Sequence, residues 1–204
     1  MSLSSYSDLK SSIQSWMFDR SDLATEAADF VTLCEADLNR VLRTRRQLTI
    51  ATLTLDANSR VALPTDYLEF RRVTAMTTPR LTLDMVTSDY RDAFYPYRES
   101  GFPAVFTIDG DGILVLPATT ADIEFEYYAE IAPLPEAAPS NWLLEKFPNI
   151  YLYGSLKHAA IFIGDDGRTQ AMGSMFNGLL DALVSSERGA MWSRGNARVH
   201  GPTP

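Results

Sequence analysis

The chain has 204 residues, of which 46% are hydrophobic and 22% charged, so it has the composition of an ordinary globular protein and enough length for a real core. No apolar run approaches the roughly 18 residues that a membrane-spanning helix requires, and the polar N-terminus lacks the pattern of a secretory signal. The single cysteine excludes an internal disulfide and a cysteine-based zinc site. The net charge of −8 argues against binding of nucleic acid by bulk attraction.

The first 43 residues predict two helices. Between residues 5 and 18, apolar side chains recur at three- and four-residue steps and form one stripe. Residues 22–43 repeat this pattern, with Cys34 on the apolar face and Ser21 as the expected N-cap. Because only a few residues join the two helices, we expect them to form an antiparallel hairpin.

The middle of the chain predicts a β-rich lobe over residues 47–130. Runs of alternating or β-branched residues, bounded by turn residues, predict strands at residues 47–55, 60–63, 70–76, 80–85, 105–108, 113–116 and 123–128. We expect three strand pairs: the first and second strands around residues 57–59, the third and fourth around residues 77–79, and the fifth and sixth around Asp109-Gly110-Asp111-Gly112, whose glycines supply positive φ angles. A short helix at 88–95, capped by Ser88, interrupts the strands.

Helices return in the last third of the chain. The prolines of residues 132–140 predict a stiff crossover, followed by helices at 142–147, 149–163 and 168–191. Pro148 is well placed to begin the second of these, and the mostly apolar composition of that helix predicts burial on several sides. The third is expected to bury a face that consists of Met172, Met175, Phe176, Leu179, Leu180, Leu183 and Val184.

This order of elements predicts an α+β fold. The N-terminal helices (5–43) and the C-terminal helices (141–191) are expected to form one helical bundle, with the central antiparallel β-rich lobe as a separate layer. We therefore expect one domain over residues 1–192. The polar, Gly- and Pro-containing residues 193–204 are expected to form a flexible, extended C-terminal arm.

Few residues predict chemistry. The Asp109–Gly112 run lacks the ligand spacing of a calcium loop, and Asp165-Asp166, between two glycines, fits helix caps. Cys34 and His158 have no sequence partners that would make a nucleophilic site. The aromatic residues between Tyr90 and Phe106 are expected to pack in the core and in loops. The sequence therefore predicts no catalytic residue, no cofactor and no metal site.

Arginine is concentrated at two places, and 15 of the 18 basic residues are arginine. The planar guanidinium group suits ion pairs at interfaces. Near the end of the second helix the basic residues either complement the helix dipole or make intermolecular contacts; in the arm they either solubilise it or bind a partner. The candidate portal or inter-subunit contacts are Arg40, Arg43, Arg45, Arg46, Arg188, Arg194 and Arg198.

Four stretches together resemble a known family. They are the helical pattern of Tyr6, Leu9, Ile13 and Trp16 with residues 22–43, then residues 62–69, residues 101–129 with Gly101-Phe102-Pro103 and Leu116-Pro117, and the run Asn141-Trp142-Leu143-Leu144 with residues 148–160. In this order and spacing, the chain is similar to the head-to-tail adaptor proteins, also called head completion or gateway proteins, of tailed bacteriophages.

The resemblance implies a structural virion protein at the neck, where head and tail meet, made in the host cytoplasm. Such a protein forms a homo-oligomeric ring of about twelve copies below the dodecameric portal protein, with the closed symmetry common in assemblies. It extends the channel for the genomic double-stranded DNA without sequence-specific binding, and provides the platform for a tail, nozzle or tail-tube protein. The resemblance implies no enzyme, no cofactor and no membrane, and a C-terminal segment that often engages the portal.

Other functions remain open from the sequence. The main alternative is another ring-forming head or tail completion protein, such as a stopper or a tail terminator. A small enzyme with an active site between subunits would depend on Cys34 or His158 being reactive. A regulatory DNA-binding protein is the alternative that the charge of −8 favours least.

Overall fold

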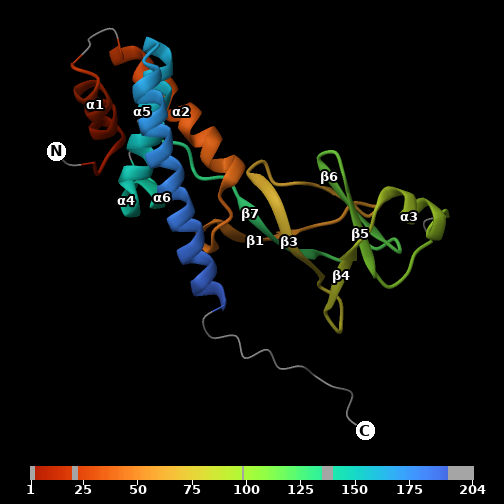
Figure 1. The fold of residues 1–204 in the computed structure, drawn as a ribbon. Helices are drawn as coiled ribbons and strands as arrows, with labels where there is room; N and C mark the ends of the chain where they lie inside the picture. Colours follow the sequence, from red (N-terminus) through yellow and green to blue (C-terminus); the bar gives the residue numbers. More distant parts are fainter. Residues whose placement is uncertain (1–2, 20–22, 98, 135–139, 193–204) are drawn as a thin grey trace. The chain divides into compact units, whose positions relative to one another are not determined.

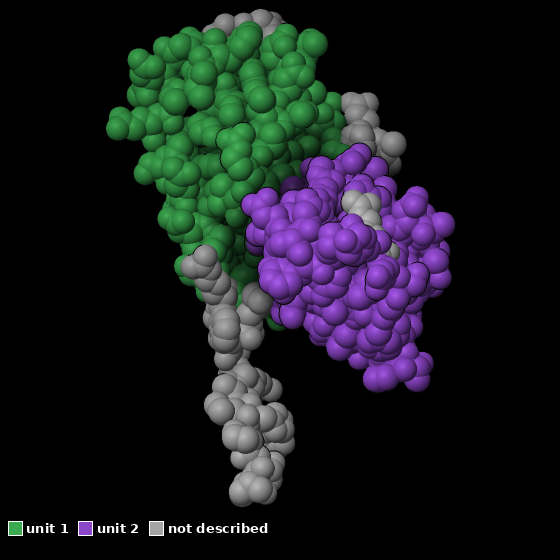
Figure 2. All heavy atoms as spheres, turned by 90° about the vertical axis from the view of Figure 1, so that its right-hand side faces the viewer, with its two compact units in different colours: residues 1–46, 131–204 green, residues 47–130 purple. Residues whose placement is uncertain are grey.

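The computed structural model describes residues 3–19, 23–97, 99–134 and 140–192, and the chain forms two compact units (Figures 1 and 2). One unit combines the two ends of the chain, Met1–Arg46 and Ile131–Pro204, and is helical; the other, Gln47–Glu130, contains the strands. The fold class is therefore α+β, as predicted. No helix in the described part of the chain is long and apolar enough to cross a membrane.

The helical unit is organised around α5. Its helices are α1 (Tyr6–Trp16), α2 (Leu23–Val41), α4 (Trp142–Lys146), α5 (Pro148–Ile163) and α6 (Asp166–Trp192), and a 3₁₀ turn, η1 (Arg45–Gln47), follows α2. Helix α5 packs against each of the other four helices, which confirms the predicted burial on several sides. Pro148 occupies the first turn of α5, and Gly164 ends it in the left-handed conformation, with φ 74°.

The helices from both ends of the chain share one hydrophobic core. Its fully buried members include Leu9 and Ile13 of α1, Leu38 of α2 and Tyr151 of α5. Because these residues are far apart in the sequence, this unit can form only after both chain ends are present.

The β unit is a seven-stranded curled sheet with the order β1-β7-β3-β4-β5-β6-β2. The strands are β1 (Leu48–Leu53), β2 (Arg60–Ala62), β3 (Tyr67–Ala75), β4 (Leu81–Met85), β5 (Val105–Asp109), β6 (Gly112–Leu116) and β7 (Ile123–Ala129). Alternate residues of β7 are buried: Ile123, Phe125 and Tyr127 belong to the core of this unit, whereas Glu124 and Glu126 pair with arginines outside it.

Two expectations about strand pairing are wrong. Strand β2 does not return along β1; it pairs with β6, and β1 pairs with β7. Ser59, which has φ 59°, directs the chain away from β1 and towards β6. Its hydroxyl group donates a hydrogen bond to Thr119 O and accepts one from Thr119 N, in the segment that follows β6. The lobe is also not wholly antiparallel: β4 and β5 are parallel, since helix α3 (Ser88–Phe94) connects them as a crossover.

Four smaller expectations are corrected. Thr87, not Ser88, caps α3. In the turn between β5 and β6, Gly110 has a positive φ of 62°, whereas Gly112 already belongs to β6. Met175 does not lie inside: 52% of it is exposed. The last helix begins at Asp166, two residues earlier than predicted, and Asp165, not Asp166, accepts the capping hydrogen bond, from Arg168 N.

Candidate interaction surfaces

The run Asn141-Trp142-Leu143-Leu144 has a structural role, and Asn141 is its key residue. The side-chain oxygen of Asn141 accepts hydrogen bonds from Leu143 N and Leu144 N, so it caps α4. Its Nδ2 atom donates to Ala132 O at 2.7 Å and to the Tyr151 hydroxyl at 2.8 Å. One side chain thus joins α4, α5 and the crossover segment.

The Tyr151 hydroxyl extends this network to α2. It donates to Glu35 Oε1 at 3.1 Å, and the same oxygen accepts Leu134 N at 2.9 Å. Burial raises the pKa of Glu35 and outweighs these hydrogen bonds, which lower it. Burial, together with the charge of Glu35, also raises the pKa of Tyr151. Glu35, Tyr151 and Asn141 form a buried polar network whose role is to hold the helical unit together.

A second polar cluster lies at the surface between α2 and α5. Asp37 Oδ2 accepts a hydrogen bond from Lys157 Nζ at 2.5 Å and meets His158 Nε2 at 3.0 Å. Burial opposes ionisation of Asp37, but the hydrogen bonds from Lys157 and His158 outweigh it and lower the pKa of the carboxyl group. Burial and the nearby Lys157 lower the pKa of His158. His158 is therefore a hydrogen-bond partner of Asp37, beside the Asp37–Lys157 ion pair.

The chemistry needed for an enzyme is missing at Cys34. Its side chain is fully buried against α5, and burial raises the pKa of the thiol to about 12. A nucleophilic cysteine requires the thiolate, which this environment disfavours strongly at neutral pH. Cys34 is a small core residue, as its place on the apolar stripe predicted.

The four predicted arginines near the end of α2 have different surroundings. Arg43 Nη1 donates to the carbonyl groups of Asn39 and Leu42, so it satisfies the C-terminal end of the helix. Arg45 forms an ion pair with Glu187 of α6, with 3.3 Å between Nε and Oε2. The guanidinium group of Arg46 lies 5.9 Å from the centre of the Trp142 ring.

The side chain of Arg40 is more exposed to solvent than that of Arg45. It is 78% exposed, against 52% for Arg45, and its ion pair with Asp37 of the same helix is long at 3.8 Å. The structure therefore brings Arg40, Arg43, Arg45 and Arg46 to one end of α2. The side chain of Arg188 and all of Arg194 and Arg198 lie outside the described residues.

Helix α3 is fixed to the β5–β6 hairpin through Asp109. Its carboxylate accepts hydrogen bonds from Ser88 Oγ at 2.9 Å, from Thr107 Oγ1 at 3.3 Å and from Arg91 Nη1. Burial opposes ionisation, but Ser88 and Arg91 outweigh it and lower the pKa of Asp109. The carboxylate that the sequence places in a turn therefore anchors a helix.

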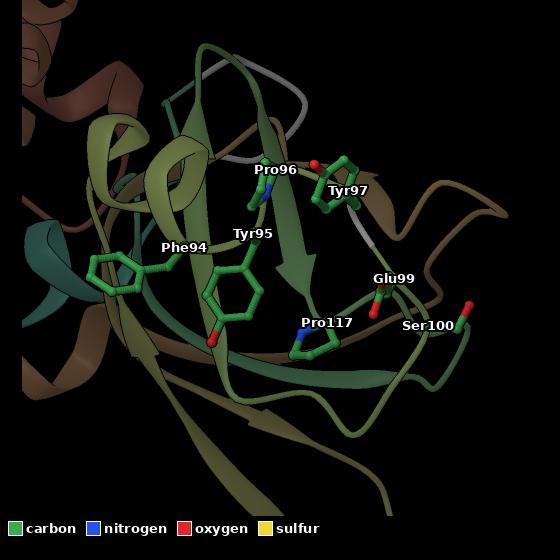
Figure 3. A pocket seen from close by; sticks show the side chains of 7 residues that line it. All are labelled: Phe94, Tyr95, Pro96, Tyr97, Glu99, Ser100 and Pro117. Carbon is green, nitrogen blue, oxygen red and sulfur yellow. The ribbon is translucent and has the colours of Figure 1, made fainter.

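A cavity of about 320 Å³ opens beside the end of α3 (Figure 3). Six lining residues come from the segment that ends and follows α3, and the seventh follows β6: Phe94, Tyr95, Pro96, Tyr97, Glu99, Ser100 and Pro117. Tyr97 is 85% exposed and Phe94 66%. Phe94 stacks on Tyr90 of the same helix, with ring centres 4.3 Å apart, whereas Tyr97 lies beyond the end of α3; the expectation that this aromatic stretch packs in the core and in loops is therefore wrong for Tyr97.

The sequence held a partial signal for this cavity. Tyr, Phe and Pro are unusually dense between Tyr90 and Pro103. Periodicity over a seven-residue helix does not say which aromatic rings face outward, and the contribution of Pro117 depends on strand pairing. The cavity could be found only once the sheet was known.

Comparison with known proteins identifies one family. The sequence profile described as SU10 adaptor protein matches residues 4–199, which include nearly all of both units. No curated protein matches the chain.

Proposed function

The chain belongs to the SU10 adaptor protein family, and on this premise we propose that it is the head-to-tail adaptor of a tailed bacteriophage. A ring of about twelve copies binds below the portal protein, continues the DNA channel and presents the attachment surface for the tail. The observation that carries the proposal is the family match over residues 4–199. Membership of an adaptor family also supports a structural, non-enzymatic role in the virion.

We assign residues 1–192 to one adaptor domain with a helical and a β unit, and residues 193–204 to an arm. Within the helical unit, the buried network around Tyr151 joins α2, α4 and α5, as expected of a body that positions neighbouring subunits. Arg45 pairs with Glu187 and Arg46 contacts the Trp142 ring, both within the same chain. Arg40 is more exposed than Arg45 and is therefore better placed to contact a partner protein.

The charge of the chain suits a protein that lines a DNA channel. Residues 47–130 contain 13 of the 26 acidic residues and six of the 18 basic residues, so the β unit carries −7 of the net −8. Negative walls repel phosphate groups, and a genome passing such a wall slides without adhering.

Binding to the portal ring from the same phage tests the proposal, and Arg40 offers a sharp variant. We expect the chain to co-sediment with the portal ring and Arg40→Glu to weaken this binding at least tenfold, because the loss is repeated in each copy of a ring. Arg60→Glu is the matched control, since Arg60 is an exposed arginine of the β unit. Equal binding by both variants would remove Arg40 from the interface, and no co-sedimentation of the unaltered chain would contradict the proposed function.

A further inference from the structure

Hydrogen bonds position two parts of the wall of the cavity beside α3. On one side, Asp109 fastens α3 through Ser88 and Arg91. On the other, the backbone is pinned by two hydrogen bonds, from Gly101 N to Ala118 O at 3.0 Å and from Ala118 N to Glu99 O at 2.9 Å. A cavity whose walls are positioned before binding loses little conformational entropy when it takes a ligand.

Gly101 shows how closely these walls approach each other. A Cβ atom at this position would lie 3.0 Å from Pro117 Cβ, so any other residue would require the proline ring to shift by a few tenths of an ångström. Pro117, which directly follows β6, lines the cavity together with Glu99 and Ser100 (Figure 3).

The lining selects a particular kind of ligand. Aromatic and proline rings offer flat apolar faces, which bind the rings of an extended, proline-containing segment in the polyproline II conformation. Glu99 adds a carboxylate at the same cavity, and a carboxylate pairs with the guanidinium group of an arginine. The lining therefore fits a segment that has prolines and an arginine a few residues away.

This chain contains such a segment. Residues 193–204 include Arg194, Arg198, Pro202 and Pro204 and no acidic residue, whereas the β unit carries a net charge of −7. Composition and charge of the two are complementary. In the extended polyproline II conformation twelve residues span about 37 Å.

We propose that residues 198–204 of one copy bind in the α3 cavity of a second copy, with the prolines against Tyr97 and Pro117 and Arg198 beside Glu99. The proposal rests on the ring of the proposed function. Two different surfaces of the same chain that bind each other make a head-to-tail contact, which closes a ring when it is repeated around an axis. The arm would thus join adjacent subunits.

Disulfide trapping in the full chain tests this contact directly. Ser100→Cys places a thiol at the cavity and Thr203→Cys places one on the arm, while buried Cys34 stays protonated. Copies labelled with ¹⁴N and ¹⁵N are mixed and oxidised mildly. We expect disulfides that join the two isotopes, and a loss of that product when Thr52→Cys of the edge strand β1 replaces Ser100→Cys. Disulfides within single chains only, or equal yields from the Thr52→Cys control, would overturn the proposal.

A peptide titration shows whether the recognition is specific. The peptide of residues 193–204 is added to the full chain with Pro202→Ala and Pro204→Ala, whose own arm no longer competes. We expect saturable binding, a loss of about tenfold with Tyr97→Ala or with a peptide in which both prolines are alanine, and a loss of about two- to fivefold with Glu99→Gln. Absence of binding, or equal binding of the alanine peptide, would overturn the proposal. The portal measurement does not use this cavity, so the two proposals can fail separately.

Discussion

The Tyr151 hydroxyl group is the point where three parts of the helical unit meet. It accepts a hydrogen bond from Asn141, which caps α4, and donates one to Glu35 of α2. Every polar atom of a buried network must keep its partners, because an unsatisfied buried group costs about 1–3 kcal/mol. The run of residues around Asn141 therefore has a role in the folding of the helical unit.

Removal of this hydroxyl group should weaken the fold without destroying it. In Tyr151→Phe, Glu35 keeps its bond from Leu134 N and Asn141 keeps its bond to Ala132 O. We therefore expect the free energy of unfolding to fall by about 1–2 kcal/mol, measured by urea denaturation. An unchanged midpoint would show that the network contributes nothing to stability.

Glu35 should make stability depend on pH. Because the fold raises its pKa above the ordinary value of 4.5, the native state holds a proton that the unfolded chain has already released, and the free energy of unfolding falls as the pH rises through the interval between the two pKa values. Glu35→Gln has no such titration. We expect the free energy of unfolding of Glu35→Gln, relative to that of the unaltered chain, to increase as the pH is raised from 4.5 towards 7. Urea denaturation at each pH measures this difference. A constant difference over this range would contradict the raised pKa.

At the scale of elements, the contact of α5 with α2 and α6 depends on Gly154. A Cβ atom there would lie 2.4 Å from Cys34 Sγ and 2.8 Å from the Phe176 ring. These distances are too short for any real side chain, so the helices approach as closely as they do because the residue is glycine. The buried Cys34 is small for the same reason.

Gly154→Ala should destabilise the protein although alanine favours helix. We expect a loss of about 1–3 kcal/mol in the free energy of unfolding, because the helices must move apart. Gly178→Ala in α6 is the matched control, since nothing lies within 4 Å of its added methyl group, and it should stabilise by about 0.5–1 kcal/mol. If both substitutions stabilise the protein, α5 does not approach α2 and α6 at Gly154 as closely as described.

The sequence predicted elements far better than it predicted their partners. Helix α5 could be placed because it is apolar on several sides and begins at Pro148, and the β5–β6 hairpin because Asp109-Gly110-Asp111-Gly112 is a local turn signal. The pairing of β2 with β6 joins residues about 50 positions apart, and no local pattern encodes it. The parallel β4–β5 pair was missed for the same reason, since α3 was expected to be only an interruption.

For the candidate surfaces too, the sequence predicted local features but not the tertiary contacts. The cluster from Arg40 to Arg46 could be read from the chain, but the ion pair of Arg45 with Glu187 depends on α6, which follows more than a hundred residues later. The α3 cavity requires Pro117 and Ala118 beside Gly101, which only the folded sheet provides. Composition indicates which residues are available for contacts, and tertiary structure decides which of them remain exposed.

At the scale of the whole molecule, charge is divided unevenly between the two units. The β unit carries −7, and the remainder of the chain carries −1 although it includes the basic arm. An adaptor through which DNA passes should not bind the duplex tightly. The charge distribution therefore predicts the behaviour of the isolated chain towards duplex DNA.

We expect no binding of a short DNA duplex at physiological salt, with a dissociation constant weaker than about 10⁻⁴ M, because the net charge repels phosphate groups. Fluorescence anisotropy of a labelled duplex measures this. Tight, salt-sensitive binding by the full chain would favour a DNA-binding protein over an adaptor.

The central claim, a ring on the portal, is tested most directly by mass. The purified chain is mixed with the portal ring from the same phage, and the complex is weighed by native mass spectrometry. The account predicts a mass increase of about twelve copies of the 22.7 kDa chain, in keeping with closed ring symmetry. An intact portal ring that gains no mass, or that gains one or two copies at any concentration of the chain, would contradict it.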